Sequence, residues 1–344
     1  MNKKNIYLII VLLVCVSILE ISAGAYYFLQ YPNIQTSQKK YIDFYVPKNS
    51  TWQSVKDSLK SNNLIKSEKS FDFALKLIGK KKQAMCGKYV LEPNISNRAF
   101  INRLAYGMSH HVNIELKMTR YTEWVARNLS RQMEVDSASL ANYLLSDSLL
   151  LRYNLNKDNS LALFIRFSKE MSWCASPAEI VAEITKEYDK FWNPERRALA
   201  SKTGLTIPQI HILASIIEEE TNEYEDKCMV AGVYINRIHK GMPLQSCPTV
   251  RFAWGDFTID RILKTHLEIE SPYNTYKNAG LPPGPIRIPS EKSIDAVLNY
   301  VHHRYLYICA KSDFSGTHEY AVTFQEHSRN ARKYQRELNK RGIK

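Results

Sequence analysis

The hydrophobic pattern begins with one long apolar run, from Ile6 to Leu29, which Glu20 interrupts. At about 1.5 Å per residue, a helix over this run is long enough to cross a hydrocarbon core of ~30 Å. Lys3 and Lys4 precede the run, and positive charges mark the cytoplasmic side of a span. We therefore predict that residues 1–31 form a cytoplasmic tip and a single-pass signal anchor in the inner (cytoplasmic) membrane. The rest of the chain would then lie on the periplasmic, extracytoplasmic side.

A cleaved signal peptide is the alternative to this anchor. The small residues of the stretch 22–25 could form a cleavage site, and the carboxyl of Glu20 is unfavourable inside a span unless it lies near an edge. The aromatic residues Tyr26, Tyr27 and Phe28 favour the anchor, because such rings gather at the membrane interface. Both possibilities export the body of the protein.

After a polar stretch at 32–40, which predicts a linker, strand and helix patterns alternate over residues 41–108. Residues 41–47 alternate like a strand, capped helices are predicted from residues 52 and 68, and a second strand is predicted at 87–91. A last helix follows the capping pair Ser96 and Asn97. This order of elements resembles the LysM-like fold, a small module that grips N-acetylglucosamine polymers in many exported proteins. A generic α+β cap on the main domain is the alternative.

Residues 109–205 predict an intermediate, mainly helical part. A strand is expected at 112–117, and amphipathic or capped helices at 121–133, 137–145 and 177–192. We find no pattern of catalytic or ligand-binding residues in this part, so we expect it to serve as scaffold.

The stretch Ile207–Thr221 predicts a buried helix that ends in three glutamates. Thr206 is a good N-cap, Pro208 suits the first turn, and apolar residues surround the helix on nearly all sides. At ~100° per residue, Glu220 points within roughly 35° of the mean apolar direction. Glu218 and Glu219 point more than about 120° away, where side chains can reach water. Glu220 is therefore the carboxyl that we expect on the buried side.

A carboxyl in such a position has two interpretations. Carboxylates are rarely buried unless they are paired or used, and desolvation raises the pKa of a buried carboxyl, which suits a general acid near neutral pH. The alternative is a structural ion pair with an arginine.

The composition of the chain limits which partners and ligands it can have. The chain has 344 residues, and 47 Lys and Arg against 34 Asp and Glu give a net charge of +13, which favours an anionic membrane or polymer as surroundings. Export argues against nucleic acid as a partner. The sequence has neither an H-E-x-x-H nor a C-x-x-C motif, so we predict no metal site and no cofactor. The six cysteines are scattered, which predicts buried small side chains with at most one or two disulfides.

Several spaced motifs in the C-terminal part resemble the YceG-like family, the endolytic murein transglycosylases. The motifs that carry this resemblance are, in chain order, the stretches 214–221, 236–237, 244–245, 248–250, 273–276 and 280–284, followed by His318, Glu326 and His327. The resemblance covers residues 206–335. It implies a mixed α/β catalytic core at 206–344, and the anchor and LysM-like module agree with the family layout. The fold class is therefore predicted as α+β.

The resemblance implies an enzyme that cuts the β-1,4 bond between N-acetylmuramic acid and N-acetylglucosamine inside nascent peptidoglycan, leaving 1,6-anhydro ends and ending elongation. Peptidoglycan polymerases (penicillin-binding proteins) would be its partners. The catalytic residue would be Glu220, which acts as acid and then as base. Glu218 would orient loops or substrate. The residues that would bind glycan are Asn236, Gln245, Thr249, Tyr273, Asn274, Thr275 and Tyr276; bracing of loops is their alternative role.

Two departures from the family pattern keep other functions open. Cys247 stands where the family usually has Asp, and residues 161–170 replace a stretch that contains glycine and Pro-Asp-Thr-Tyr. One alternative is a catalytically weakened, glycan-binding scaffold of the cell-wall machinery. The other is a hydrolase, which needs a second carboxylate near Glu220, from Glu223 or Asp226.

Overall fold

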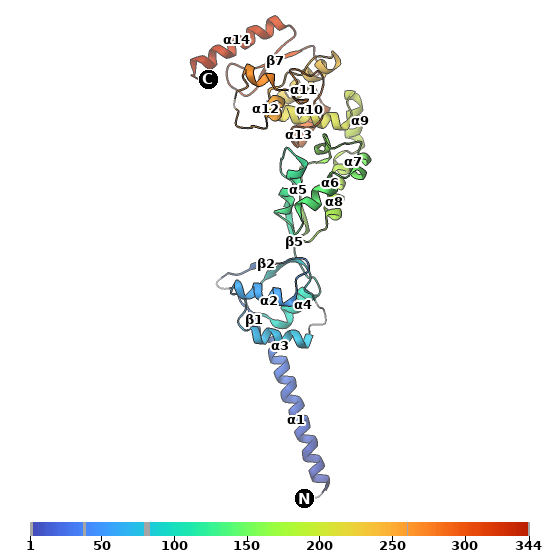
Figure 1. Ribbon diagram of the computed structural model, residues 1–344, viewed down its shortest axis with the longest axis vertical. Coiled ribbons are helices and arrows are strands. Elements are labelled where there is room, and N and C mark those ends of the chain that lie inside the picture. The colour runs from blue at the N-terminus through green and yellow to red at the C-terminus, as the bar shows by residue number, and fades with distance from the viewer. Residues whose placement is uncertain (1–2, 37–38, 79–82, 260, 343–344) are drawn as a thin grey trace. The chain divides into compact units, whose positions relative to one another are not determined.

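The structure is a computed structural model that describes residues 3–36, 39–78, 83–259 and 261–342 (Figure 1). The chain divides into two compact units. The first contains residues 1–114, 132–134 and 169–175, and the second contains residues 115–131, 135–168 and 176–344. The boundary near residue 114 lies close to the predicted end of the small module, but two later segments of the chain return to the first unit.

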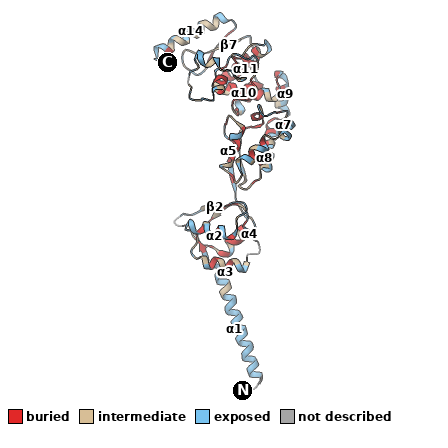
Figure 2. Cartoon of the chain, viewed as in Figure 1, coloured by how far each residue is buried: buried red, intermediate tan, exposed pale blue. Residues whose placement is uncertain are grey.

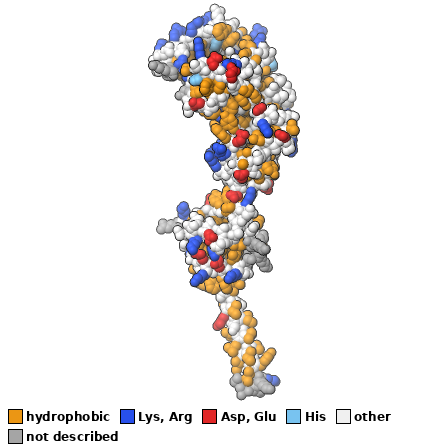
Figure 3. Space-filling view, viewed as in Figure 1, with side chains coloured by type: hydrophobic (Ala, Val, Ile, Leu, Met, Phe, Trp, Pro, Cys, Tyr) orange, Lys and Arg blue, Asp and Glu red, His pale blue; other side chains and the backbone are white. Residues whose placement is uncertain are grey.

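The N-terminal apolar run forms one helix, α1 (Lys3–Gln30), which continues through the small residues at 22–25. From Lys4 to Gln30 this helix is long and apolar enough to cross a membrane, and its most apolar part is not covered by other parts of the protein. Figure 3 shows hydrophobic side chains along its length. The helix is therefore compatible with the predicted membrane anchor.

The first unit has the predicted order strand, helix, helix, strand. Strands β2 (Ile42–Val46) and β3 (Gly87–Leu91) pair antiparallel, with helices α2 (Trp52–Ser61) and α3 (Glu68–Ile78) between them in the chain. Both pack on an apolar core together with α4 (Asn97–Ala105). The LysM-like character of this arrangement stays a prediction.

The predicted linker at 32–40 begins with a paired strand. Strand β1 (Pro32–Ile34) pairs antiparallel with β4 (Ile95–Ser96), so the chain enters the first unit directly after α1. The amides of Asn33 and Asn97, both fully buried, hydrogen-bond to each other at 2.9 Å. Such a pair satisfies polar groups that burial would otherwise leave without partners.

One disulfide, Cys86–Cys174, closes the first unit across a sequence separation of 88 residues. It joins the segment before β3 to the segment after β6 (Ser168–Ser172), the strand that pairs with β5 (His111–Glu115). The other cysteines are free; Cys228 is buried as predicted, but Cys247 is exposed.

Helices dominate the second unit, and Figure 2 shows many of its buried residues in α10 (Ile207–Glu220) and α11 (Tyr224–His239). The predicted helix at 207–221 is confirmed as α10, with a capping box between Thr206 and Gln209. Pro248 lies in the first turn of helix α12 (Cys247–Trp254). The elements of this unit are α5 (Thr122–Ser130), α6 (Ser137–Leu144), α7 (Asp147–Arg152), η1 (Ser160–Leu163), α8 (Pro177–Phe191), α9 (Pro194–Thr203), α10 (Ile207–Glu220), α11 (Tyr224–His239), α12 (Cys247–Trp254), η2 (Lys264–Glu268), α13 (Glu291–Leu298), β7 (Tyr307–Ala310), β8 (His318–Ala321) and α14 (Phe324–Lys340).

Candidate active site

The C-terminal end of α10 carries the three glutamates into the centre of the second unit. Every residue from Ile210 to Ile217 is buried, and α10 packs against α11, α12 and α13. A helix enclosed on all sides brings each of its last side chains against a different neighbouring element. The three carboxyls are all half-buried, and each has its own set of partners.

Glu220 is the carboxyl whose partners are neutral. The hydroxyls of Tyr234, on α11, and Ser246, just before α12, both donate to Oε1 of Glu220 at 2.6 Å. Among the described residues, Oε2 accepts no hydrogen bond and no cation lies within ion-pair distance of this side chain. Burial and the neighbouring carboxylate raise the pKa of Tyr234 well above 10, so its hydroxyl stays a donor. Glu220 is thus fixed through one oxygen, while the other has no protein partner among the described residues.

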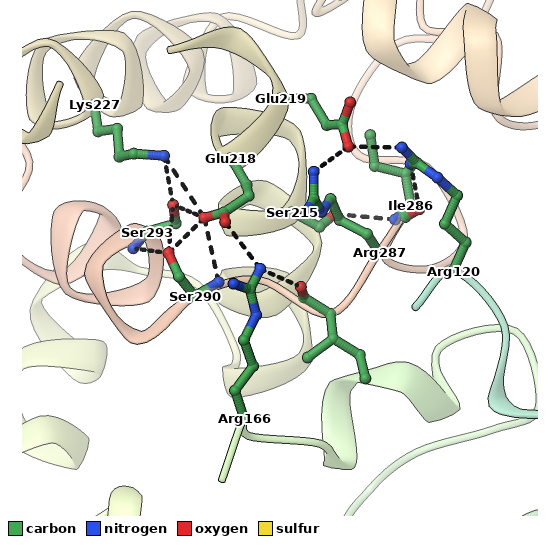
Figure 4. A network of polar contacts seen from close by, with 11 residues as sticks. Arg120, Arg166, Ser215, Glu218, Glu219, Lys227, Ile286, Arg287, Ser290 and Ser293 are labelled. Atoms are coloured by element: carbon green, nitrogen blue, oxygen red, sulfur yellow. Dashed lines mark hydrogen bonds and ion pairs between the residues drawn. The ribbon is translucent and has the colours of Figure 1, made fainter. Parts of the chain in front are cut away.

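Glu218 is held by cations and serines (Figure 4). Its carboxylate accepts hydrogen bonds from the hydroxyls of Ser290 and Ser293 and from Arg166 at 2.9 Å, and Lys227 lies at 3.6 Å. Burial alone would raise the pKa of Glu218, but these hydroxyls and cations lower it to about 2. Glu218 is therefore a permanent anion that ties α13 and the segment around residue 166 to α10.

Glu219 is paired in the same way with two arginines. Arg120 donates to its Oε1 at 2.8 Å, and Arg287 donates to the same oxygen. The expectation that Glu218 and Glu219 reach water is wrong: their side chains are 12% and 11% exposed. The helical phase identified which glutamate differs from the other two, but it could not reveal the arginines that three other segments place beside its neighbours.

Four of the predicted glycan-binding residues brace loops. Thr249, Asn274 and Thr275 are at most 1% exposed. The amide of Asn274 donates to two backbone carbonyls, and the hydroxyls of Thr249 and Thr275 lie 2.8 Å apart. Asn236 donates to the carbonyls of residues 303 and 305. Their geometry favours the bracing role that the sequence had left open as an alternative.

The other predicted residues lie nearer to open space. Gln245 is exposed and has a positive φ of 50°, a backbone conformation that is uncommon outside glycine and often found at functional sites. Tyr276 is half-buried and its hydroxyl lies 3.3 Å from the thiol of Cys247. Although Cys247 is partly open to solvent, desolvation of its sulfur by the surrounding protein raises its pKa, with a further contribution from Glu220, so its side chain is a neutral thiol near the candidate acid.

Tyr273 lies at a cavity of about 250 Å³. Its ring packs on Phe252 with the centroids 4.7 Å apart, and Phe252 stacks on Tyr121 at 5.5 Å. The residues that line the cavity are Arg120, Tyr121, Thr122, Glu123, Leu145, Lys157, Asp158, Ser160, Leu161, Phe252, Tyr273 and Pro285. The cavity therefore combines aromatic walls with charged and hydroxyl groups.

Two connections, Arg120 and helix α12, link this cavity to the glutamates at the end of α10. Arg120 lines it and also binds Glu219, the residue before Glu220. Helix α12 starts after Ser246, which binds Glu220, and reaches the cavity at Phe252, about 9 Å further along at 1.5 Å per residue.

Sequence reasoning missed the two residues that bind Glu220 directly. Tyr234 lies within an apolar helix and Ser246 within a turn, and neither position stands out from its neighbours in the sequence. Ser246 offers one signal: it is an N-cap residue of a type that usually accepts a hydrogen bond from its helix, but here its hydroxyl donates to Glu220 instead. That departure can be seen only once α12 is known.

Asp226 and Glu223, the candidates for the second carboxylate of a hydrolase, have environments that differ from that of Glu220. Asp226 is 7% exposed, and its carboxylate accepts hydrogen bonds from His318 and Tyr320. Glu223 is exposed at the start of α11. The divergent stretch 161–170 supplies Arg166, a partner of Glu218.

A model of the YceG-like family matches residues 44–333. This range includes Glu220, its partners Tyr234 and Ser246, and the loops described above. The chain belongs to the YceG-like family. Three curated relatives carry the name endolytic murein transglycosylase, one from Bacillus subtilis and two from Streptococcus pneumoniae. One, from Bacillus subtilis, is 29% identical over 88% of this chain and 87% of its own length. One of those from Streptococcus pneumoniae is 26% identical over 90% of this chain, which spans 62% of that relative.

A solved structure supports the same fold for this YceG-like chain. The crystal structure of a YceG-like protein from Listeria monocytogenes is 25% identical, covers 85% of this chain and 99% of its own, and superposes with a TM-score of 0.56.

Proposed function

We propose that this protein is a lytic transglycosylase that cuts peptidoglycan strands internally, between N-acetylmuramic acid and N-acetylglucosamine. The observation that carries the proposal is the environment of Glu220: two hydroxyls fix one carboxyl oxygen, and the other oxygen has no protein partner among the described residues. The two neighbouring glutamates are committed to cations. One carboxyl of three is thus able to exchange a proton with a substrate.

A single carboxyl suffices for this reaction. Glu220 protonates the glycosidic oxygen as the bond to the muramyl anomeric carbon breaks, and its carboxylate then takes the proton of the muramyl 6-hydroxyl. The 6-hydroxyl oxygen bonds to the anomeric carbon and closes the 1,6-anhydro ring. Because the nucleophile belongs to the substrate, neither an activated water nor a second carboxylate is required.

The aromatic cavity beside Tyr273 is our candidate for a sugar-binding subsite. The apolar faces of a sugar ring can pack on Tyr273, Phe252 and Tyr121, while Asp158 and Lys157 offer hydrogen bonds to hydroxyl and acetamido groups. Gln245 and Tyr276 would contact the glycan nearer to Glu220. In this arrangement the loops braced by Thr249, Asn274 and Thr275 hold these contacts in place.

We place the enzyme in the cytoplasmic membrane, with α1 as its anchor, its N-terminus in the cytoplasm and its catalytic unit outside. The disulfide Cys86–Cys174 supports export, because such bonds persist in oxidising compartments. Nascent strands at the membrane surface are then the substrate, and the polymerases that make them are the expected neighbours. The LysM-like module would hold the strand.

Product analysis tests this function. Purified glycan strands are incubated with the detergent-solubilised chain, and the products are weighed by mass spectrometry. We expect 1,6-anhydro ends that disappear in Glu220→Gln. Reducing ends would instead indicate hydrolysis, and intact strands would favour the scaffold function that Cys247 suggests.

The subsite has its own test. Tyr273→Ala removes an aromatic wall without touching Glu220, so we expect KM for glycan strands to rise by about tenfold with a smaller change in kcat. Trp254→Ala, which removes an exposed aromatic residue from the end of α12, is the matched control. Equal KM values for the two variants would argue against the subsite.

A further inference from the structure

Helix α1 is joined to the first unit without a free linker. The side-chain amide of Asn97 donates to the carbonyl of Phe28 at 2.9 Å, and its backbone N–H donates to the carbonyl of Tyr31 at 3.1 Å. The ring of Phe28 lies 4.9 Å from that of Phe73 on α3. If α1 crosses a membrane, the surface of the first unit around its end must therefore lie at the lipid headgroups.

Helix α3 lies across this end of α1 (Figure 1). Its inner side, with Phe71 and Ala74, packs in the core of the first unit. Its outer side presents two large apolar residues, Phe73 at 41% exposure and Leu77 at 47%. Exposed apolar residues that adjoin a membrane-spanning helix indicate a surface that water does not normally cover.

Two lysines accompany these apolar residues. Lys69 and Lys76 are exposed on α3, and no ion-pair partner for either is found among the described residues. The acidic residues of the helix are already paired, Glu68 with Lys60 and Asp72 with Lys56. The outer side of α3 therefore carries uncompensated positive charge, and Figure 3 shows Lys and Arg side chains on the part of the first unit next to α1.

We propose that the outer face of α3, formed by Lys69, Phe73, Lys76 and Leu77, rests in the interface of an anionic lipid bilayer. Phe73 and Leu77 enter the boundary between headgroups and acyl chains, and the lysine amines reach lipid phosphates. This face, called the α3 face below, would be a second membrane contact beside α1. The proposal depends on α1 being inserted, and the experiment checks that separately.

The test uses the full chain in lipid vesicles, with Cys15, Cys228, Cys247 and Cys309 changed to Ser and the disulfide kept. A fluorescent probe sensitive to polarity is attached at Leu77→Cys, at Leu12→Cys inside α1, or at Lys48→Cys in the turn between β2 and α2. Vesicles contain phosphatidylcholine alone or with phosphatidylglycerol. Quenching by spin-labelled lipid and by aqueous iodide is measured at each position.

We expect lipid quenching at position 77 to be several-fold stronger than at position 48, and to increase with phosphatidylglycerol. The double variant Lys69→Glu and Lys76→Glu should abolish that increase. The control variant Lys202→Glu and Lys240→Glu makes an equal charge change at exposed positions of the second unit and should leave the increase in place. Iodide quenching at position 77 equal to that at position 48, with position 12 quenched by lipid, would overturn the proposal, because the α3 face would then lie in water while α1 is inserted. Lack of lipid quenching at both 12 and 77 would overturn the anchor and the α3 face together.

Discussion

At the residue scale, the structure separates three glutamates that the sequence shows as neighbours. Glu220 contacts hydroxyls, whereas Glu218 and Glu219 contact cations. Helical phase could distinguish Glu220 because the direction of a side chain depends only on local geometry. It could not identify Tyr234, Ser246, Arg166 or Arg120 as partners, because these come from segments whose positions depend on tertiary packing.

This separation predicts opposite consequences for two matched variants. Glu220→Gln should lower kcat by about 100-fold or more, because the acid is lost. Its unfolding free energy should change by less than about 1 kcal/mol, because an amide oxygen can still accept hydrogen bonds from Tyr234 and Ser246. Glu218→Gln should retain more activity but lose about 3 kcal/mol of stability, because it leaves Lys227 buried without a counter-ion. Turnover of anhydro products and urea unfolding measure the two effects. Equal loss of activity in both would contradict a single acid/base.

Cys247 yields a second prediction. Its thiol lies 3.3 Å from the hydroxyl of Tyr276. A carboxylate accepts a stronger hydrogen bond than a thiol, and Asp stands at this position in the family pattern that the sequence resembles. We expect Cys247→Asp to raise kcat about fivefold, equivalent to about 1 kcal/mol in the barrier, as measured by release of anhydro products. Cys247→Ala serves as control, and a similar gain in both variants would show that loss of the thiol, not the new carboxylate, is responsible.

At the element scale, elements with a clear cap, apolar spacing or alternation in the local sequence were predictable, whereas α12 was not. The capping box and apolar spacing of α10 and the alternation of β2 follow from the local sequence. Helix α12 is short and carries Pro248 in its first turn, which the sequence alone presents as part of a loop. The hydrogen bond between Thr249 and Thr275 joins segments that are 26 residues apart, so the sequence identified these residues but left their role open.

The packing between α8 and α10 predicts a dependence of stability on pH. His211 on α10 is fully buried and accepts a hydrogen bond from Trp192 at 3.2 Å. Burial lowers the pKa of His211 to about 3. In the unfolded chain this pKa is about 6.5, so the unfolded state takes up the proton first and stability falls as the pH drops below 6.5.

Between pH 7 and pH 5, proton uptake by His211 in the unfolded chain should lower the free energy of unfolding by about 2 kcal/mol. This pH range lies above the one in which Glu218 titrates. Urea unfolding at both pH values measures the loss. His211→Gln retains an acceptor for Trp192 and should remove most of this loss, whereas His302→Gln, at an exposed position, should leave it unchanged. The same loss in all three proteins would refute this account.

At the scale of the whole molecule, the sequence predicted three parts after an apolar helix, at 41–108, 109–205 and 206–344, but not that residues 132–134 and 169–175 return to the first unit. The bond Cys86–Cys174 closes that return. Five cysteines outside the span could not be paired by spacing alone, because pairing depends on which distant segments the fold brings together.

We expect the double variant Cys86→Ser and Cys174→Ser to destabilise the first unit by about 2–5 kcal/mol, since the bond restricts a long loop in the unfolded chain. Thermal unfolding with and without reductant measures this effect. The reductant should lower the melting temperature of the parent and of Cys309→Ser, but not that of the double variant. A parent that is insensitive to reductant would contradict the prediction.

The hydrogen bonds of Glu220 have a consequence for how turnovers follow one another. Both hydroxyl donors occupy Oε1, so in the proposed reaction Oε2 delivers the proton and later receives one. The departing proton is replaced by that of the muramyl hydroxyl, and the enzyme ends each cycle in the protonation state in which it began. Catalysis would then draw nothing from bulk solvent, and its rate would be insensitive to buffer concentration even where densely packed glycan leaves little free water.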